Sequence, residues 1–217
     1  MSELEWSLPG DRERLLGLID EFLELPAHER AAVLFRVADA IEQNLNSLGE
    51  LLARENGKPI QQTRDEVRVT ARIFRGFGEE AKRIFGRVLP MDAVPGQERH
   101  LAMTVRQPLG VVAAIVPFNY PVELYAHKAA AALAAGNAVI VKPPTECPLA
   151  LLTIAALIEE AGSPAAAHQM ITGPEAAIGE FPASDPRDQL LPVTGRTANG
   201  RPAADLAVSP LTHVTLA

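Results

Sequence analysis

The middle of the chain alternates two apolar segments with one alanine-rich segment, and this order constrains the fold more than any other feature. Residues 110–116 contain no polar side chain and are rich in Val, which predicts a strand buried on both faces. Residues 122–135 are rich in Ala and free of Gly and Pro, which favours a helix, and the following glycine gives a stop signal. Residues 138–141 form a second apolar strand. Strand, helix and strand at this spacing predict a right-handed crossover between parallel strands.

Two proline-containing loops follow the two predicted strands. Residues 117–121, with the sequence PFNYP, end the first strand because proline cannot donate to a strand ladder, and residues 142–146, KPPTE, end the second. Parallel strands place their carboxyl ends at one edge of a sheet, where open α/β sheets bind ligands. Asn119 is therefore a candidate amide donor for an oxyanion, or alternatively a cap for the helix that follows.

The remaining segments extend this unit into a larger α/β fold. Helices are expected over residues 11–25, 26–56, 63–86 and 149–161, with shorter ones around Gly179 and over 201–208. Strands are expected over residues 87–94, 98–107, 168–172, 189–193 and 213–216, although Pro192 is unfavourable inside a central strand. This order predicts a doubly wound, mostly parallel, Rossmann-like sheet with an N-terminal helical segment and a β-ribbon.

The expected elements divide the chain into three parts. Residues 1–86 are predicted to form helices that pack on a ligand-binding domain, and residues 87–108 form an antiparallel ribbon joined by Pro95 and Gly96. Residues 109–217 are predicted to form an α/β ligand-binding domain, and this domain is expected to be incomplete.

Composition excludes several classes of partner. A net charge of −7 and a pI near 5.3 argue against nucleic acid or an anionic membrane surface as the main partner. No apolar run is long enough to span a bilayer, and the N-terminus lacks the pattern of a signal peptide. The single cysteine, Cys147, rules out an internal disulfide and fits a reducing cytoplasm, which is the expected location.

The loop sequences resemble a known family. PFNYP followed by VIVKPPTECPL is similar to the aldehyde dehydrogenase superfamily, which carries a Pro-Trp-Asn-Phe-Pro loop and a Lys-Pro-Ser-Glu-type loop after the next strand. The ENGKP sequence at residues 55–59 also resembles the family's Glu-x-Gly-Lys-Pro segment. Members oxidise small aldehydes to acids, or to acyl-CoA, with NAD or NADP and a cysteine thiohemiacetal. The resemblance covers roughly residues 45–217.

The resemblance implies roles for several residues. Asn119 matches the family's oxyanion donor, and Lys128 matches a helix lysine near the proton-relay path, although a surface lysine remains the alternative. Lys142 matches the lysine that contacts the adenosine ribose. Thr145 stands where NAD-preferring members carry Glu, so a 2′-phosphate is not repelled and NADP is slightly favoured over NAD. Glu146 could reverse that preference.

Further positions match the family's cofactor path. Ile115, Val116, Pro117 and Phe118 correspond to residues along the adenine and nicotinamide path, and Gly179 corresponds to a glycine under the adenine. Thr194, Gly195 and Arg196 correspond to the turn that approaches the pyrophosphate, with Arg196 in place of the usual Ser.

The last residues depart from the family pattern. Ala217 stands at the position of the general-base Glu, and the nucleophilic cysteine belongs further on, so the chain is expected to be truncated before both. Cys147 matches a Thr at a helix start, where the helix N-terminus would lower its pKa, but a structural thiol is the favoured reading.

Two interpretations follow from this departure. The chain is either the cofactor-binding part of an aldehyde dehydrogenase, inactive alone, or an NADP(H)-binding or interaction module that acts as a pseudoenzyme. The family's ribbon lies at its oligomerisation surface, which implies a homo- or hetero-oligomer.

Overall fold

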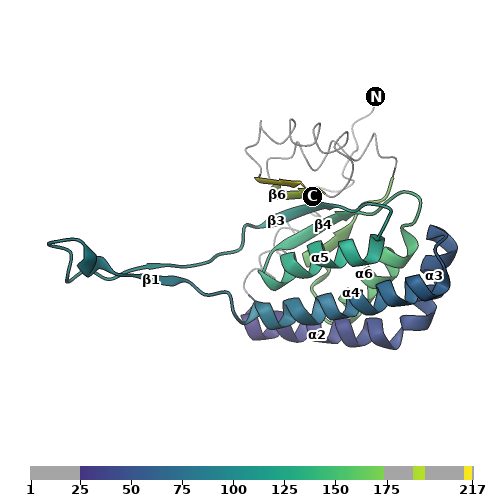
Figure 1. Cartoon of the computed structure of the whole chain (residues 1–217), viewed down its shortest axis with the longest axis horizontal. Coiled ribbons are helices and arrows are strands. Elements are labelled where there is room, and N and C mark those ends of the chain that lie inside the picture. Colours follow the sequence, from purple (N-terminus) through teal and green to yellow (C-terminus); the bar gives the residue numbers. More distant parts are fainter. Residues whose placement is uncertain (1–24, 174–187, 194–212, 217) are drawn as a thin grey trace, which may run out of the picture.

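A parallel sheet organises the fold, with the described helices on one side of it (Figure 1). The computed structural model describes residues 25–173, 188–193 and 213–216. Within them the sheet has five strands in the spatial order β5 (His168–Met170), β4 (Ala138–Lys142), β3 (Val111–Ile115), β6 (Asp188–Val193) and β7 (His213–Leu216). All neighbouring pairs are parallel, which confirms the doubly wound sheet expected from the sequence.

The connections reverse direction at β3. From this strand the chain steps outward through β4 to β5, then returns to place β6 on the other side of β3 and β7 beyond it. Ligands of such sheets bind at this reversal, outside the carboxyl ends of the strands. The reversal in this chain lies between β3 and β6.

Two helices of the crossovers cover one face of the sheet (Figure 1). They are α5 (Pro121–Ala134) and α6 (Leu149–Glu160). Helix α5 begins with Pro121, whose missing N–H group costs nothing at a first helical position. Most of its buried residues are alanines. Gly136 adopts a left-handed φ of 83° and connects α5 to β4.

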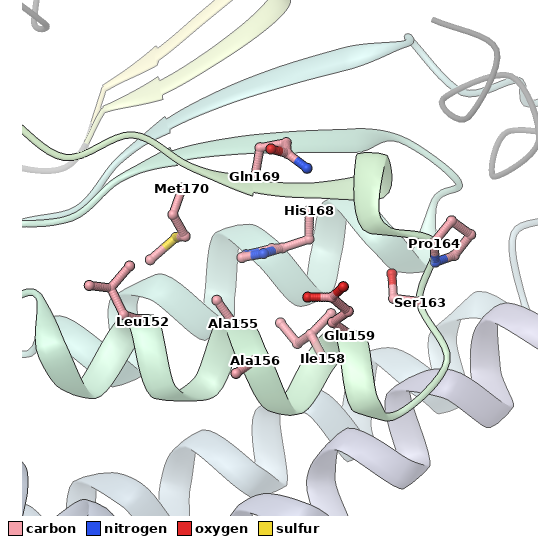
Figure 2. A pocket seen from close by; sticks show the side chains of 10 residues that line it. All are labelled: Leu152, Ala155, Ala156, Ile158, Glu159, Ser163, Pro164, His168, Gln169 and Met170. Carbon is pink, nitrogen blue, oxygen red and sulfur yellow. The ribbon is translucent and has the colours of Figure 1, made fainter. Parts of the chain in front are cut away.

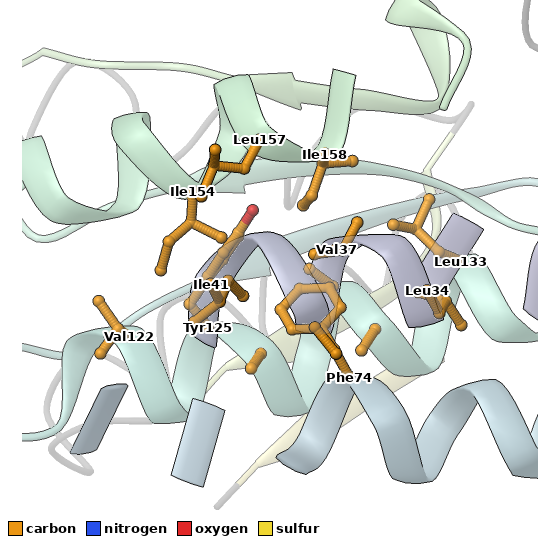
Figure 3. Close-up of a cluster of buried hydrophobic side chains, with 14 of the residues drawn as sticks. Leu34, Val37, Ile41, Phe74, Val122, Tyr125, Leu133, Ile154, Leu157 and Ile158 are labelled. Atoms are coloured by element: carbon orange, nitrogen blue, oxygen red, sulfur yellow. The ribbon is translucent and has the colours of Figure 1, made fainter. Parts of the chain in front are cut away.

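An outer helical layer packs on α5 and α6. It consists of α2 (Ala27–Gln43), α3 (Leu45–Asn56) and α4 (Ile60–Ala81). Phe74 of α4 and Tyr125 of α5 meet in the shared core, with ring centroids 6.5 Å apart (Figure 3). Other fully buried large side chains of this core are Leu34, Ile41, Leu133, Ile154 and Ile158. Burial of this apolar stripe explains why the three helices form.

Charged side chains of the outer layer contact both ends of α5 and α6. Arg30 donates to the C-terminal carbonyl of α5 over 3.1 Å, and Arg36 donates to the carbonyl just after α6 over 2.7 Å. Glu55 accepts two N–H groups at the start of α6, both over 2.7 Å, and Glu66 accepts one at the start of α5 over 3.1 Å. Cations at C-termini and anions at N-termini match the helix dipoles and satisfy backbone groups that have no partner inside the helix.

The β-ribbon protrudes from the body as a long arm (Figure 1). Its strands, β1 (Arg87–Leu89) and β2 (Ala102–Thr104), pair antiparallel as expected, with Arg87 opposite Thr104. The ladder is much shorter than the two predicted strands. Pro90 follows β1 directly and starts a 3₁₀ turn, η1 (Met91–Ala93), so the strand cannot continue to residue 94.

Other boundaries differ from the sequence-based expectation. The single helix expected over 26–56 is two helices, because Asn44 leaves the helical conformation and donates its side-chain amide to the carbonyl of Ala40. Helix α4 begins at Ile60, after Pro59, and ends at Ala81 rather than at residue 86. A further 3₁₀ turn, η2 (Ala165–Ala167), precedes β5.

Some predicted elements cannot be compared with the structure. The helices expected over 11–25, around Gly179 and over 201–208 lie outside the described residues. In the described part of the chain, every helix is too short or too polar to cross a membrane.

Candidate active site

The ends of four strands lie level with one another at the carboxyl edge of the sheet. Ile115 of β3 is opposite Lys142 of β4 on one side and Val193 of β6 on the other. Val193 is in turn opposite Leu216 of β7. The loops after β3 and β4 therefore leave the sheet side by side, next to the reversal between β3 and β6.

The loop after β3 presents Asn119 to solvent. The N–H group of Val116 donates to the carbonyl of Lys142 over 3.1 Å, which extends the ladder one residue beyond β3. Pro117 is half-buried, whereas Phe118, Asn119 and Tyr120 are exposed. The exposed Asn119 side chain makes no cap on α5, whose N-cap residue is Tyr120. The capping alternative for Asn119 is therefore wrong, and the amide remains available to a ligand.

Residues that the sequence did not single out hold this loop. Asn56 donates its side-chain amide to the carbonyl of Phe118 over 2.8 Å. The ammonium of Lys58 lies 4.0 Å from the centroid of the Tyr120 ring and 2.6 Å from a carboxylate oxygen of Glu66. Only the ENGKP resemblance pointed to this region, and it gave no role to these side chains.

Glu66 is the buried charge of this group. Its side chain is 1 % exposed, and it accepts the N–H of Val122 besides the contact with Lys58. Burial raises the pKa of Glu66, whereas the Lys58 ammonium and the N–H groups at the start of α5 act in the opposite direction. A buried carboxylate needs such partners, and the contacts with Lys58 and Val122 compensate Glu66 for its lost hydration.

The loop after β4 places a buried lysine at the same edge. Lys142 is 5 % exposed and its ammonium donates to the hydroxyl of Thr145 over 3.2 Å. Thr145 and Glu146 are exposed. A fixed ammonium beside an exposed hydroxyl can bind a ribose hydroxyl or a phosphate oxygen. The residue pair predicted to select the cofactor is thus in direct contact.

Two other candidates have environments that shift their pKa. Lys128 is half-buried on α5, about two turns from Asn119, and burial lowers its pKa to about 8. Cys147 is fully buried, and burial raises the pKa of its thiol, with Glu55 and Glu146 adding to the effect while Asn56 opposes it. The expected lowering by a helix N-terminus is therefore wrong, because loss of hydration outweighs the helix dipole at this position.

The remaining predicted residues cannot be placed. Gly179, Thr194, Gly195 and Arg196 lie outside the described residues. In the ranges that the structure does describe, no three acidic, histidine or cysteine side chains are grouped to hold a metal.

A hollow lies between α6 and β5 (Figure 2). It has a volume of about 330 Å³ and is lined by Leu152, Ile158, Glu159, His168 and Met170, among others. His168 is hydrogen-bonded to the hydroxyl of Tyr125 over 2.7 Å, and burial lowers its pKa to about 4. The histidine is therefore neutral at physiological pH.

Comparisons with known proteins agree with this geometry. The sequence model of the aldehyde dehydrogenase family matches residues 18–217. Over 154 residues the chain is 46 % identical to a 3-sulfolactaldehyde dehydrogenase of Priestia aryabhattai, a match covering 71 % of this chain and 32 % of that protein. It is 34 % identical to an NADP⁺ succinate-semialdehyde dehydrogenase of Escherichia coli K12, covering 88 % and 39 %. The chain thus spans about a third to two-fifths of the length of these relatives.

Solved structures share the fold. An aldehyde dehydrogenase from Brucella melitensis biovar abortus superimposes with a TM-score of 0.89 at 34 % identity, covering 94 % of this chain and 42 % of that one. A glyceraldehyde-3-phosphate dehydrogenase from Methanocaldococcus jannaschii, solved with NADP, superimposes with a TM-score of 0.85 at 27 % identity, covering 95 % and 45 %.

Proposed function

Because the chain belongs to the aldehyde dehydrogenase family, we propose that it supplies the cofactor-binding part of an NAD(P)-dependent oxidation of an aldehyde to a carboxylic acid. The observation that carries this proposal is the meeting of the Asn119 and Lys142 loops at the reversal of the sheet. The nicotinamide cofactor accepts the hydride in such a reaction. This chain would bind and orient the cofactor and offer a hydrogen bond to the oxygen of the reacting carbonyl.

Each residue has a place in this proposal. Lys142 and Thr145 bind the adenosine ribose, and Thr145 admits the 2′-phosphate of NADP, which makes NADP slightly favoured over NAD. Asn119 stabilises the oxyanion, and Lys128, with its lowered pKa, relays a proton. The strand end and loop from Ile115 to Phe118 line the cofactor path, and Gly179, Thr194, Gly195 and Arg196 complete it.

Chemistry by these 217 residues alone is not expected. Ala217 occupies the position of the general base, and Cys147, the only cysteine in the sequence, is buried beside the Lys142 loop. Thioester formation needs a nucleophile and a base, and none of the residues assigned here is proposed for either role. The alternative proposal is a module that binds NADP(H) or other subunits without catalysis.

The β-ribbon supports association. Val88, Leu101 and Val105 are 72 %, 74 % and 71 % exposed on an arm that has little contact with the body (Figure 1). Apolar side chains of this size on a protruding ribbon favour burial against another subunit. We propose that the ribbon contacts a second copy of this chain or a related subunit. We also propose a cytoplasmic location, on the single reduced cysteine.

A cofactor titration tests the proposal. Fluorescence of NADPH and NADH is measured with the wild type, Lys142→Ala and Thr145→Glu. We expect saturable binding, a larger loss for NADPH than for NADH in Lys142→Ala, and a shift toward NADH in Thr145→Glu. A wild type that does not bind NADPH at millimolar concentration would refute the proposal. Succinate semialdehyde and 3-sulfolactaldehyde, which the relatives' names specify, should not be oxidised by this chain alone.

A further inference from the structure

Side chains of one short segment, residues 55–66, contact the Asn119 loop both before and after Asn119. On the side before Asn119, Asn56 holds the carbonyl of Phe118 over 2.8 Å. On the side after it, Lys58 lies over the Tyr120 ring and Glu66 accepts the first free N–H of α5. Asn119 itself is exposed and lies between these fixed points.

These contacts are costly to break because they are centred on an ion pair that is largely buried. The carboxylate of Glu66 and the ammonium of Lys58 are 2.6 Å apart, with side chains 1 % and 17 % exposed. Loss of either partner leaves the other charge without compensation in a place that water barely reaches. Pro121 adds rigidity because its ring fixes φ between Asn119 and the helix.

We propose that Asn56, Lys58 and Glu66 are positioning residues, which hold the Asn119 amide in the orientation that an oxyanion donor needs. They act through the loop backbone and the start of α5 and do not touch the reacting atoms. An oxyanion donor is effective only if it is oriented before charge develops, and displacements of about 1 Å are costly. This inference rests on the proposed role of Asn119.

The chain contains a matched control for this role. Glu55 accepts the N–H groups of Leu149 and Ala150, both over 2.7 Å, and so holds the start of α6 after the Lys142 loop. Glu55→Gln and Glu66→Gln are the same chemical change in the same segment. Glu55 holds the start of α6, which follows the Lys142 loop, whereas Glu66 holds the start of α5, which follows the Asn119 loop.

Hydrogen exchange of the full chain, followed by mass spectrometry, tests the inference. In Glu66→Gln we expect exchange to rise by about tenfold or more over residues 118–124 and to stay within about twofold over 147–153. Glu55→Gln should give the reverse pattern. Unchanged exchange over 118–124 in Glu66→Gln, or an equal rise in both segments, overturns the inference.

A second variant covers the case in which Glu66→Gln does not fold. Asn56→Ala leaves the ion pair intact and removes the hydrogen bond to Phe118. It should loosen residues 118–120 while α5 stays protected. If it changes nothing there, Asn56 has no positioning role.

An NMR signal of Asn119 separates orientation from general stability. The side-chain amide pair, assigned by its loss in Asn119→Ala, should move toward random-coil shifts in Glu66→Gln and stay in place in Glu55→Gln. Cofactor titration of the same proteins separates the two proposals. A wild type that does not bind NADPH refutes the proposed function and leaves the loop pattern standing. A wild type that binds, with an unchanged Asn119 signal in Glu66→Gln, refutes the positioning role alone.

Discussion

Acidification should destabilise the chain through one partly buried histidine, His168 at the start of β5. Tyr125 is fully buried, and burial raises its pKa well above 10, so the phenol keeps its proton. Its hydroxyl is hydrogen-bonded to Nε2 of His168 over 2.7 Å. Burial lowers the pKa of His168 to about 4. A second ring proton makes both ring nitrogens donors and places a positive charge where burial disfavours it.

The sign and size of the effect follow from the two pKa values. The unfolded chain binds the proton near pH 6.5 and the folded chain only near pH 4, so stability is complete above about pH 7 and is lost as the pH falls. Between pH 7.5 and pH 5 this single group removes about 2 kcal/mol from the free energy of unfolding. Glu159 lines the same hollow as His168 (Figure 2). Its negative charge would stabilise a protonated His168 and so reduce this loss.

Urea unfolding at pH 7.5 and pH 5 measures the effect. Carboxylates also titrate in this range, but their contribution cancels in the difference between the wild type and His168→Gln. The wild type should lose about 2 kcal/mol more than this variant. His127, exposed on α5, provides the control, since His127→Gln should follow the wild type. Equal losses in the wild type and His168→Gln would refute the reasoning.

Three further outcomes are expected. Phe74→Ala should lower the free energy of unfolding by about 3–5 kcal/mol in a urea titration, because Phe74 is fully buried in the core; a loss below 1 kcal/mol would contradict this packing. Gly86→Ala should remove amide protection from β1, since a Cβ there would overlap the carbonyl oxygen of Thr104, whereas Gly76→Ala, with open space around it, should leave β1 protected. Cys147 should react with a thiol reagent only after unfolding in urea, because it is buried with a raised pKa; rapid reaction of the folded protein would show that the thiol is accessible.

The sequence predicted the central unit well because its signals are local. The apolar run of β3, the alanine-rich α5 and the glycine after it each identify an element by composition alone. The order of these elements predicted a parallel crossover, which places the Asn119 and Lys142 loops at the same edge of the sheet.

Features that hydrophobic periodicity does not report, and features that depend on distant contacts, could not be predicted in the same way. The helix break at Asn44 and the short ribbon ladder arise from a side-chain hydrogen bond and a proline whose effects periodicity does not report. Glu66 looked like any surface carboxylate of a charged helix, and only the docking of α5 shows that it is buried. The helix start at Cys147 suggested a lowered pKa because burial cannot be read from one position.

The contacts at both ends of α5 and α6 bear on how the chain folds during synthesis. The ribosome releases Arg30, Arg36, Glu55 and Glu66 before any residue of the two helices that they contact. Until residue 161 has emerged, the nascent outer layer lacks at least one of the helix ends that these four side chains contact, and its apolar face is not fully covered. We therefore expect the outer layer of α2, α3 and α4 to complete its packing only after the second half of the chain has been synthesised.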